Sequence, residues 1–353
     1  MVGEGPPSTP FAAPGKGVDA GLRRHDGVEL PEVPNAPMTR FILARCAQAA
    51  IVLLVMSFVI YSLIGLMPGD PIDVMISSNP GATPEVVARL RAIYGLDQPI
   101  LLRYGHWLAA ALHGDFGYSR THAQPVLTVL LPALLQTCKL MLTSFIVSVV
   151  LAFALGIWAS LKPGGIADSV ISLFAFAGIS VPVFWLALVL ILVFAVTWHV
   201  LPASGVGTVG DGGVTDQLRH LILPVTTLAL ANIGSFTRFI RAAMIETLRM
   251  DHIRTARAKG AGERRVVLVH ALRNAMIPVV TVIALSFGGL FSGALITETM
   301  FAQPGMGKMI YDAILGNDFN LALTGLLFAT LVTLLGNLLA DLAYGWLDPR
   351  IAL

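Results

Sequence analysis

Long stretches without a charged residue constrain the fold of this chain more than any other feature, and six of them predict its spans. Four of them run for 22 to 24 residues: 46–69, 140–161, 274–297 and 319–340. Because roughly 20 apolar helical residues cross a bilayer core about 30 Å thick, each of the four predicts a transmembrane helix. A fifth stretch, 220–237, has 18 residues and is expected to extend a few residues past Arg238.

The sixth stretch, 169–210, has 42 uncharged positions and has room for one span with a loop or for two short spans. Residues 169–198 are rich in Leu, Val, Ile and Phe, whereas 202–213 are mostly small residues, which favours one span followed by an irregular external loop. Pro182 lacks the N–H that would bond four residues back, so we expect it to kink this span. The sequence thus predicts six transmembrane helices.

Composition agrees with an all-α integral membrane protein. Hydrophobic residues make up 56% of the 353 residues and charged residues only 12%. A soluble domain needs more charge to cover its surface, and a nucleic-acid partner calls for a basic excess that a net charge of +2 does not supply. Cys46 and Cys138 lie in or beside apolar runs, which argues against a disulfide framework or a cysteine-rich metal site.

The distribution of Lys and Arg predicts the orientation in the membrane. The segment 241–273 holds eight basic and three acidic residues, whereas 65–131 holds four basic and five acidic residues. Cytoplasmic loops carry the basic excess, so 241–273 is predicted to lie inside and 65–131 outside. An even number of spans then places both termini in the cytoplasm.

The chain divides into five regions on these grounds. Residues 1–37 contain seven of the 21 prolines and no apolar periodicity, which predicts a disordered cytoplasmic tail and leaves Met38 as an alternative start to Met1. The other four regions are a first span, an external segment, a core of five spans with a cytoplasmic loop at 241–274, and a cytoplasmic C-terminus: 38–64, 65–131, 132–345 and 346–353.

The external segment is expected to contain two short helices. Thr83-Pro84-Glu85 has the residues of a helix start, and 99–112 forms a second amphipathic stretch. The two helices would form either a small cap that packs on the chain's own spans or a docking surface for an external partner, and the cap is favoured.

The segment 250–262 carries the clearest functional signal. It is too polar to enter the bilayer and rich in alanine, so it predicts a short helix along the membrane surface that ends at Gly260 or Gly262. Ile253, Ala256, Arg257 and Gly260 share one face at helical spacing, and small residues there would let another protein approach closely. Contact with anionic lipid is an equal alternative.

Other classes of membrane protein leave weaker traces in the sequence. A secondary transporter or channel driven by an ion gradient should place charges within the bilayer, but Lys139, Arg238, Glu298 and Asp341 lie near predicted helix ends, where such residues anchor the interface. An intramembrane enzyme would need a nucleophile with its base or a zinc motif, and neither is found. No lysine lies in a phosphate-binding loop, so we expect the chain not to hydrolyse ATP itself.

Several motifs together resemble those of the permease subunits of ABC importers, in the dipeptide, oligopeptide, nickel and glutathione subfamily. The first is residues 251–260, Asp-His-Ile-Arg-Thr-Ala-Arg-Ala-Lys-Gly, followed by His-Ala-Leu-Arg-Asn-Ala at 270–275 and Pro278. The wider family has Glu-Ala-Ala, three residues and Gly, where this chain has Arg254, Thr255 and Ala256 before Gly260, a departure that the peptide subfamily shares. The other motifs occur at 68–71, 95–99, 114–117, 182–185, 298–307 and 347–350.

The resemblance, which covers about 39–353, implies a type I ABC importer permease in a bacterial inner membrane. Its partners would be a second homologous permease subunit, two cytoplasmic ATPase subunits, an external solute-binding protein and membrane lipid. Gly289 and Gly293 form a Gly-x-x-x-Gly step that permits close helix packing, and we hypothesise that it contacts the second permease.

The resemblance also implies roles for particular residues. It implies a coupling helix that docks in the ATPase and includes Asp251, Ile253, Arg254, Thr255, Ala256, Arg257, Lys259, Gly260 and Gly262. Apart from the resemblance, Glu298, Gly305 and Gly307 form a candidate external gate, with structural anchoring as the favoured alternative for Glu298. The resemblance implies no catalytic residue, no metal and no cofactor on this chain, with ATP and Mg²⁺ held by the partner subunits. Dipeptide, oligopeptide, glutathione and nickel remain open as cargo, with peptide favoured.

Overall fold

The computed structural model describes residues 38–66, 83, 85–86, 89, 97–208, 210 and 213–347. The predicted tail at 1–37, most of the helix expected to begin near Thr83, and the residues after 347 lie outside the described residues. Helices dominate the described chain, and two residues each of β1 (Tyr118–Ser119) and β2 (Gln124–Pro125) pair as antiparallel strands.

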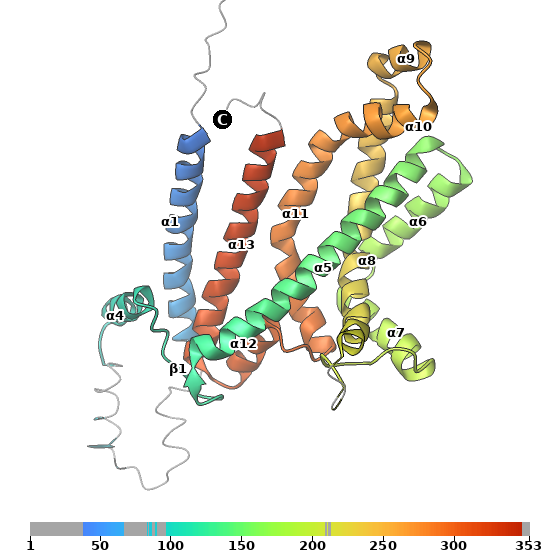
Figure 1. Cartoon of the computed structure of the whole chain (residues 1–353). Helices are drawn as coiled ribbons and strands as arrows, with labels where there is room; N and C mark the ends of the chain where they lie inside the picture. The colour runs from blue at the N-terminus through green and yellow to red at the C-terminus, as the bar shows by residue number, and fades with distance from the viewer. Residues whose placement is uncertain are drawn as a thin grey trace, which may run out of the picture.

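Five helical runs among the described residues are long and apolar enough to cross a membrane, and each overlaps one of the five shorter uncharged stretches. They are α1 (Met38–Ile64), α5 (Val126–Leu161), α8 (Val214–Leu248), the continuous run α10 (Glu263–Arg265), η2 (Val266–Ala271) and α11 (Leu272–Met300), and α13 (Phe319–Leu347). The segment η2 is a π-helical turn. In Figure 1, α1 begins and α13 ends at the same end of the molecule as α9 (Asp251–Ala258).

The sixth predicted span has a different form from the one expected. Residues 166–197 make two helical pieces, α6 (Ile166–Ser180) and α7 (Val183–Leu190), the latter continued by the π-helical η1 (Ile191–Thr197), and the two pieces meet at 107°. Val181 and Pro182 are both extended, because a residue before proline avoids helical dihedral angles and proline itself donates no hydrogen bond. The helix therefore breaks at Pro182, where a kink within one span was predicted.

Two charged residues that were predicted near helix ends lie inside helices. The helix α5 begins at Val126 rather than near Leu140, and α8 continues to Leu248, so Lys139 and Arg238 are interior positions. The reason is that one charged residue does not end a helix, since its long side chain can extend away from an apolar surface. The guanidinium carbon of Arg238 lies 6.0 Å from the centre of the Phe176 ring.

Glycines set the closest helix contacts. A Cβ atom at Gly156 of α5 would lie 2.8 Å from Ile240 of α8, and a Cβ atom at Gly234 of α8 would lie 2.2 Å from the carbonyl oxygen of Ala175 in α6. Figure 1 shows α5 crossing α8 obliquely, with α6 running alongside α5. Of the predicted Gly-x-x-x-Gly step, Gly293 packs against Leu228 of α8 in the same chain, whereas nothing in the described structure lies within 4 Å of a Cβ at Gly289.

Short elements cover the end of the molecule opposite α9, as Figure 1 shows. These elements are α4 (Ile100–Leu112), the β1–β2 pair and α12 (Met306–Leu315), and we refer to this end as the α12 end. The helix α4 matches the predicted amphipathic stretch 99–112 and packs on α1. There the Tyr104 hydroxyl lies 2.7 Å from Ser57 Oγ, and the Tyr104 ring meets Phe58 and Tyr61 edge-on.

Candidate functional site

The short surface helix predicted within 250–262 is present as α9, at the far end of the molecule from α12 (Figure 1). It begins after Met250, which is extended, and Asp251 in its first turn favours the positive end of the helix dipole. Gly260 follows the helix with a φ of +81°, the left-handed conformation that glycine adopts without a steric cost. The helix thus ends at the first of the two predicted glycines.

Ile253 attaches α9 to the membrane helices. Its side chain is fully buried and belongs to a cluster that includes Met244 of α8 and Val266 and Val267 of η2. Ala256, on the same face, is half-buried. This corrects the expectation for Ile253, which does not belong to a face open to another protein, whereas Ala256 stays partly accessible. Helical spacing places residues on one face without telling whether that face points to the chain's own core.

Two polar contacts hold α9 to the start of the next helical run. The Arg257 guanidinium donates to both carboxylate oxygens of Glu263, with Nε–Oε1 and Nη2–Oε2 distances of 2.7 and 3.1 Å. This contact raises the pKa of Arg257 above its usual range. The Asn274 amide of α11 lies 2.9 Å from Nε2 of His252. Since α9 directly follows α8, a displacement of α9 acts on both α8 and α11.

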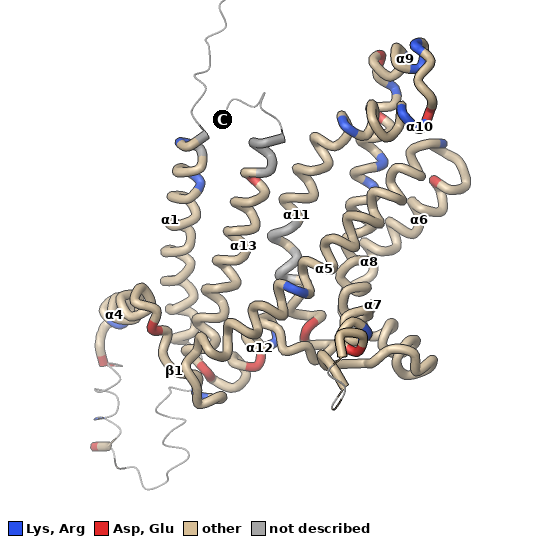
Figure 2. The backbone as a smooth tube through the Cα atoms, viewed as in Figure 1, with Lys and Arg blue, Asp and Glu red and all other residues tan. Residues whose placement is uncertain are grey.

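The opposite face of α9 is exposed. Its residues are Asp251, Arg254, Thr255, Ala258 and Lys259, and Gly260 and Gly262 beyond the helix are exposed as well. Figure 2 shows Lys and Arg gathered around α9 and α10. Arg254 lies 3.4 Å from Asp251, an exposed pair, whereas Arg257 is paired with Glu263 within the chain. Arg254 and Lys259 are the basic side chains of this face, and Lys259 takes part in none of the ion pairs found among the described residues.

The three residues of the candidate gate come together at the α12 end. Glu298, at the end of α11, is 1% exposed, and its carboxylate accepts hydrogen bonds from Thr137 Oγ1 of α5 at 2.5 Å and from the Lys308 amide at 3.1 Å. The Met306 amide in turn donates to Thr137 Oγ1 at 2.7 Å. The carboxylate thus satisfies free amides at the N-terminus of α12, where negative charge is favoured.

Gly305 and Gly307 leave the space that this carboxylate occupies. A Cβ atom at Gly305 would lie 2.1 Å from Glu298 Cδ, and one at Gly307 would lie 2.6 Å from Leu295 Cα. Both distances are shorter than any real Cβ contact. The geometry makes these residues a packed junction of α5, α11 and α12, and their role as an external gate stays a prediction.

Among the other buried carboxylates, which the sequence pattern does not single out, Asp168 and Asp318 join segments that are distant in the chain. Asp168 of α6 is 4% exposed and accepts from Arg241 Nη2 of α8 at 2.7 Å and from the Gly164 amide at 2.8 Å. Asp318, directly before α13, is 1% exposed and accepts from the Ser119 hydroxyl at 2.6 Å. In the sequence, the feature that could have identified Asp168 and Asp318 is that each is a single acidic residue directly before a long uncharged stretch.

Asp318 also binds Thr121, through its amide at 2.9 Å and its hydroxyl at 2.7 Å. Burial by itself raises the pKa of Asp318, but the hydrogen bonds from Ser119 and Thr121 together bring the pKa below its ordinary value. This carboxylate therefore fastens the β1–β2 turn to the start of α13 in its ionised form.

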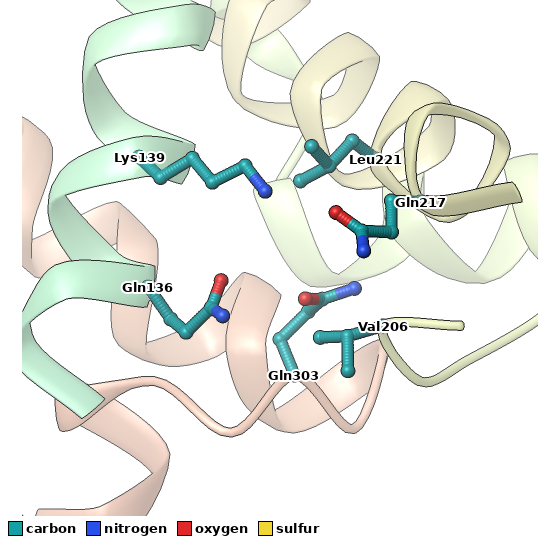
Figure 3. Close-up of a pocket in the computed structure, with 6 residues that line it drawn as sticks. All are labelled: Gln136, Lys139, Val206, Gln217, Leu221 and Gln303. Atoms are coloured by element: carbon teal, nitrogen blue, oxygen red, sulfur yellow. The ribbon is translucent and has the colours of Figure 1, made fainter. Parts of the chain in front are cut away.

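A polar pocket of about 120 Å³ lies between α5, α8 and the segment after α11. Figure 3 shows Gln136 and Lys139 of α5 reaching toward Gln217 of α8 and Gln303, with Val206 and Leu221 completing the wall. The sequence pattern does not predict this pocket, because three of its four polar residues carry no charge and interrupt no apolar stretch.

Comparison with known families accounts for nearly the whole described chain. Residues 152–353 match the family described as binding-protein-dependent transport system inner membrane component, and residues 38–152 match the N-terminal family of the same membrane component. The match thus begins at Met38, where α1 begins.

Curated relatives align over almost their full length. The dipeptide transport system permease protein DppB of Escherichia coli K12 is 35% identical over 336 residues, which cover 89% of this chain and 99% of the relative. A probable peptide ABC transporter permease of Sinorhizobium fredii is 38% identical over 311 residues, covering 88% of this chain and 98% of that protein.

A solved structure shares the fold. An inward-facing form of the methionine ABC transporter MetNI aligns with a TM-score of 0.52 at 16% identity, covering 63% of this chain and 97% of the solved chain. Together with the five apolar helices and the bent pair, this likeness gives the chain the type I ABC importer permease fold. The chain is a multi-pass membrane protein that belongs to the family of binding-protein-dependent transport system inner membrane components.

Proposed function

We propose that this chain is one of the two membrane subunits of an ATP-driven importer for dipeptides or oligopeptides. A second homologous permease would complete the pathway, two cytoplasmic ATPase subunits would bind ATP and Mg²⁺, and an external binding protein would deliver the cargo. The names of the relatives support this cargo, since those from Escherichia coli and Sinorhizobium fredii are a dipeptide and a peptide permease. The chain itself would bind no cofactor and catalyse no reaction.

The observation that carries the proposal is the way α9 is held. Ile253 fixes its inner face in the core, and Arg257 and His252 connect it to Glu263 and Asn274, which leaves an exposed polar outer face. A helix docked in an ATPase through that outer face would transmit force to α8 and α11 as a rigid body. A helix that only contacts lipid would not need these contacts with α8, α10 and α11.

This role implies an orientation. The α9 end, with its gathered Lys and Arg, would lie in the cytoplasm of a bacterial inner membrane, and α4, the β1–β2 pair and α12 would lie outside. The start of α1 and the end of α13 would then both be cytoplasmic.

Purification of the tagged chain in mild detergent tests the proposal. Recovery of a second permease and of ATPase subunits, with ATP-dependent uptake of a labelled dipeptide after reconstitution with the binding protein, is the expected result. Arg254→Glu should reduce this recovery, with Lys162→Glu, at the turn between α5 and α6, as the control. An assembly without ATPase that transports on an ion gradient alone would instead make the chain a secondary transporter.

A further inference from the structure

The pocket at Lys139 has an unusual set of polar groups for a membrane helix bundle. Lys139 takes part in none of the ion pairs found among the described residues. Gln303 is 4% exposed, and its amide nitrogen donates to the carbonyl oxygen of Gly205 at 2.6 Å. This bond fixes the side chain, and Figure 3 shows its oxygen on the side of Gln136.

We infer that this pocket binds the carboxylate of a peptide cargo. This inference rests on the proposed function and assigns one binding site for that cargo. Lys139 supplies a positive charge, and the side-chain amides of Gln136 and Gln217 supply neutral donors from α5 and α8. A cation beside amide donors complements a carboxylate, and the Gln303 oxygen is an acceptor for the adjoining peptide N–H.

The size and charge of the pocket define the class of ligand. A volume of about 120 Å³ admits a terminal residue with its carboxylate, whereas pockets that enclose a whole drug-sized ligand begin near 300 Å³. The rest of a peptide would lie outside the pocket, so side chains there would be tolerated. The positive charge of Lys139 disfavours a divalent metal cation such as nickel at this position.

The position of the pocket ties it to moving parts. Its wall comes from α5, from α8 and from Gln303, and α8 leads directly into α9. In the sequence, Gln303 lies between Glu298 and Gly305, which form the junction of α12 with α11 and α5. A shift of α8 relative to α5 would separate Lys139 from Gln217 and release a carboxylate bound between them.

Uptake by the complete transporter tests this inference. The chain is reconstituted with its second permease, ATPases and binding protein, and uptake of radiolabelled alanyl-alanine is measured for Lys139→Arg, Lys139→Gln and Lys139→Glu. Loss of one charge-assisted hydrogen bond corresponds to about a tenfold effect, so Lys139→Gln should lower uptake about tenfold. Lys139→Glu should lower it further and Lys139→Arg should retain it. ATP hydrolysis stimulated by the loaded binding protein should stay unchanged in all three.

Lys162→Gln, in an exposed lysine at the turn after α5, is the matched control and should transport as the wild type does. Wild-type uptake in Lys139→Gln and Lys139→Glu would overturn the inference. The inference would also be overturned if ATP hydrolysis fell together with uptake and neither was retained in Lys139→Arg. That pattern would indicate that Lys139 has a structural role. If the wild-type transporter shows no ATP-dependent uptake of alanyl-alanine or of a labelled oligopeptide, the proposed cargo is overturned and the carboxylate site with it.

Discussion

The carboxylate of Glu298 accepts a hydrogen bond from the hydroxyl of Thr137 at 2.5 Å, between residues 161 positions apart in the chain. The same carboxylate accepts from the backbone of Lys308, so one side chain joins the end of α11 and the start of α12 to the interior of α5. A buried acceptor with several donors around it is costly to remove, because each donor loses its partner away from water.

We expect Glu298→Ala to lower the free energy of unfolding by about 2 kcal/mol or more. Gly305→Ala should be destabilising as well, because its Cβ would lie 2.1 Å from Glu298 Cδ. Thermal unfolding of the purified chain in detergent measures both effects. Gly262→Ala is the matched control, because nothing lies within 4 Å of its Cβ and its φ of −63° suits alanine. An unchanged melting temperature in Glu298→Ala would contradict the structural role.

The ion pair between Arg257 and Glu263 makes a charge swap informative. Arg257→Glu places two carboxylates where a bidentate contact existed, so we expect ATP-dependent uptake to be lost while membrane insertion and thermal stability scarcely change. The double variant Arg257→Glu with Glu263→Arg restores the pair in reverse and should restore most of the uptake. If the double variant stays inactive while Glu263→Ala is active, Arg257 acts on a partner rather than on Glu263.

Sequence patterns predict the features of this fold that are local. Uncharged stretches locate five spans, because a bilayer sets a minimum apolar length. The polar, alanine-rich segment before Gly260 predicts the helix α9. Gly260 predicts its end, because the left-handed conformation that follows the helix favours glycine. The motifs around these elements identify the family.

The features that depend on packing between distant segments could not be predicted in this way. The capping of α12 by Glu298 requires knowing that Thr137 lies beside it, and no local pattern brings them together. The direction in which Ile253 faces is likewise set by η2 and α8. Pro182 predicts a kink or break in its helix, but the angle of 107° between the two helical pieces depends on what α6 and α7 each pack against.

Gly260 and Gly262 offer a matched pair for testing how α9 ends. Nothing lies within 4 Å of a Cβ at either position, but Gly260 has a φ of +81°, whereas Gly262 has a φ of −63°. Gly260→Ala should therefore cost about 1 kcal/mol of stability and reduce the coupling of ATP hydrolysis to uptake, while Gly262→Ala should be close to neutral. The ratio of peptide transported to ATP hydrolysed measures the coupling. Equal behaviour of the two variants would argue that backbone conformation at Gly260 does not matter.

Asp318 predicts a pH dependence at the α12 end. Its folded-state pKa is lowered, so its contribution to stability is fully present above the pKa of about 3.9 of an unfolded aspartate. That contribution is lost as the pH falls below this value and through the lowered folded-state pKa. Because Asp318→Asn removes an ionised acceptor of the Ser119 and Thr121 hydrogen bonds, we expect it to cost about 2 kcal/mol at pH 7.

Melting temperatures of the wild type and Asp318→Asn in detergent, compared from pH 7 to pH 3, measure this dependence. The difference between the two proteins should stay constant down to about pH 5 and shrink below about pH 4, where the Asp318 carboxylate of the unfolded wild type begins to take up a proton. Asp312→Asn is the control, since the Asp312 carboxylate is half-exposed and, within the described part of the chain, forms its ion pair with Lys308 one turn earlier. A difference between wild type and Asp318→Asn that widens toward acid would mean that burial outweighs the hydrogen bonds, and that the folded-state pKa of Asp318 is raised instead.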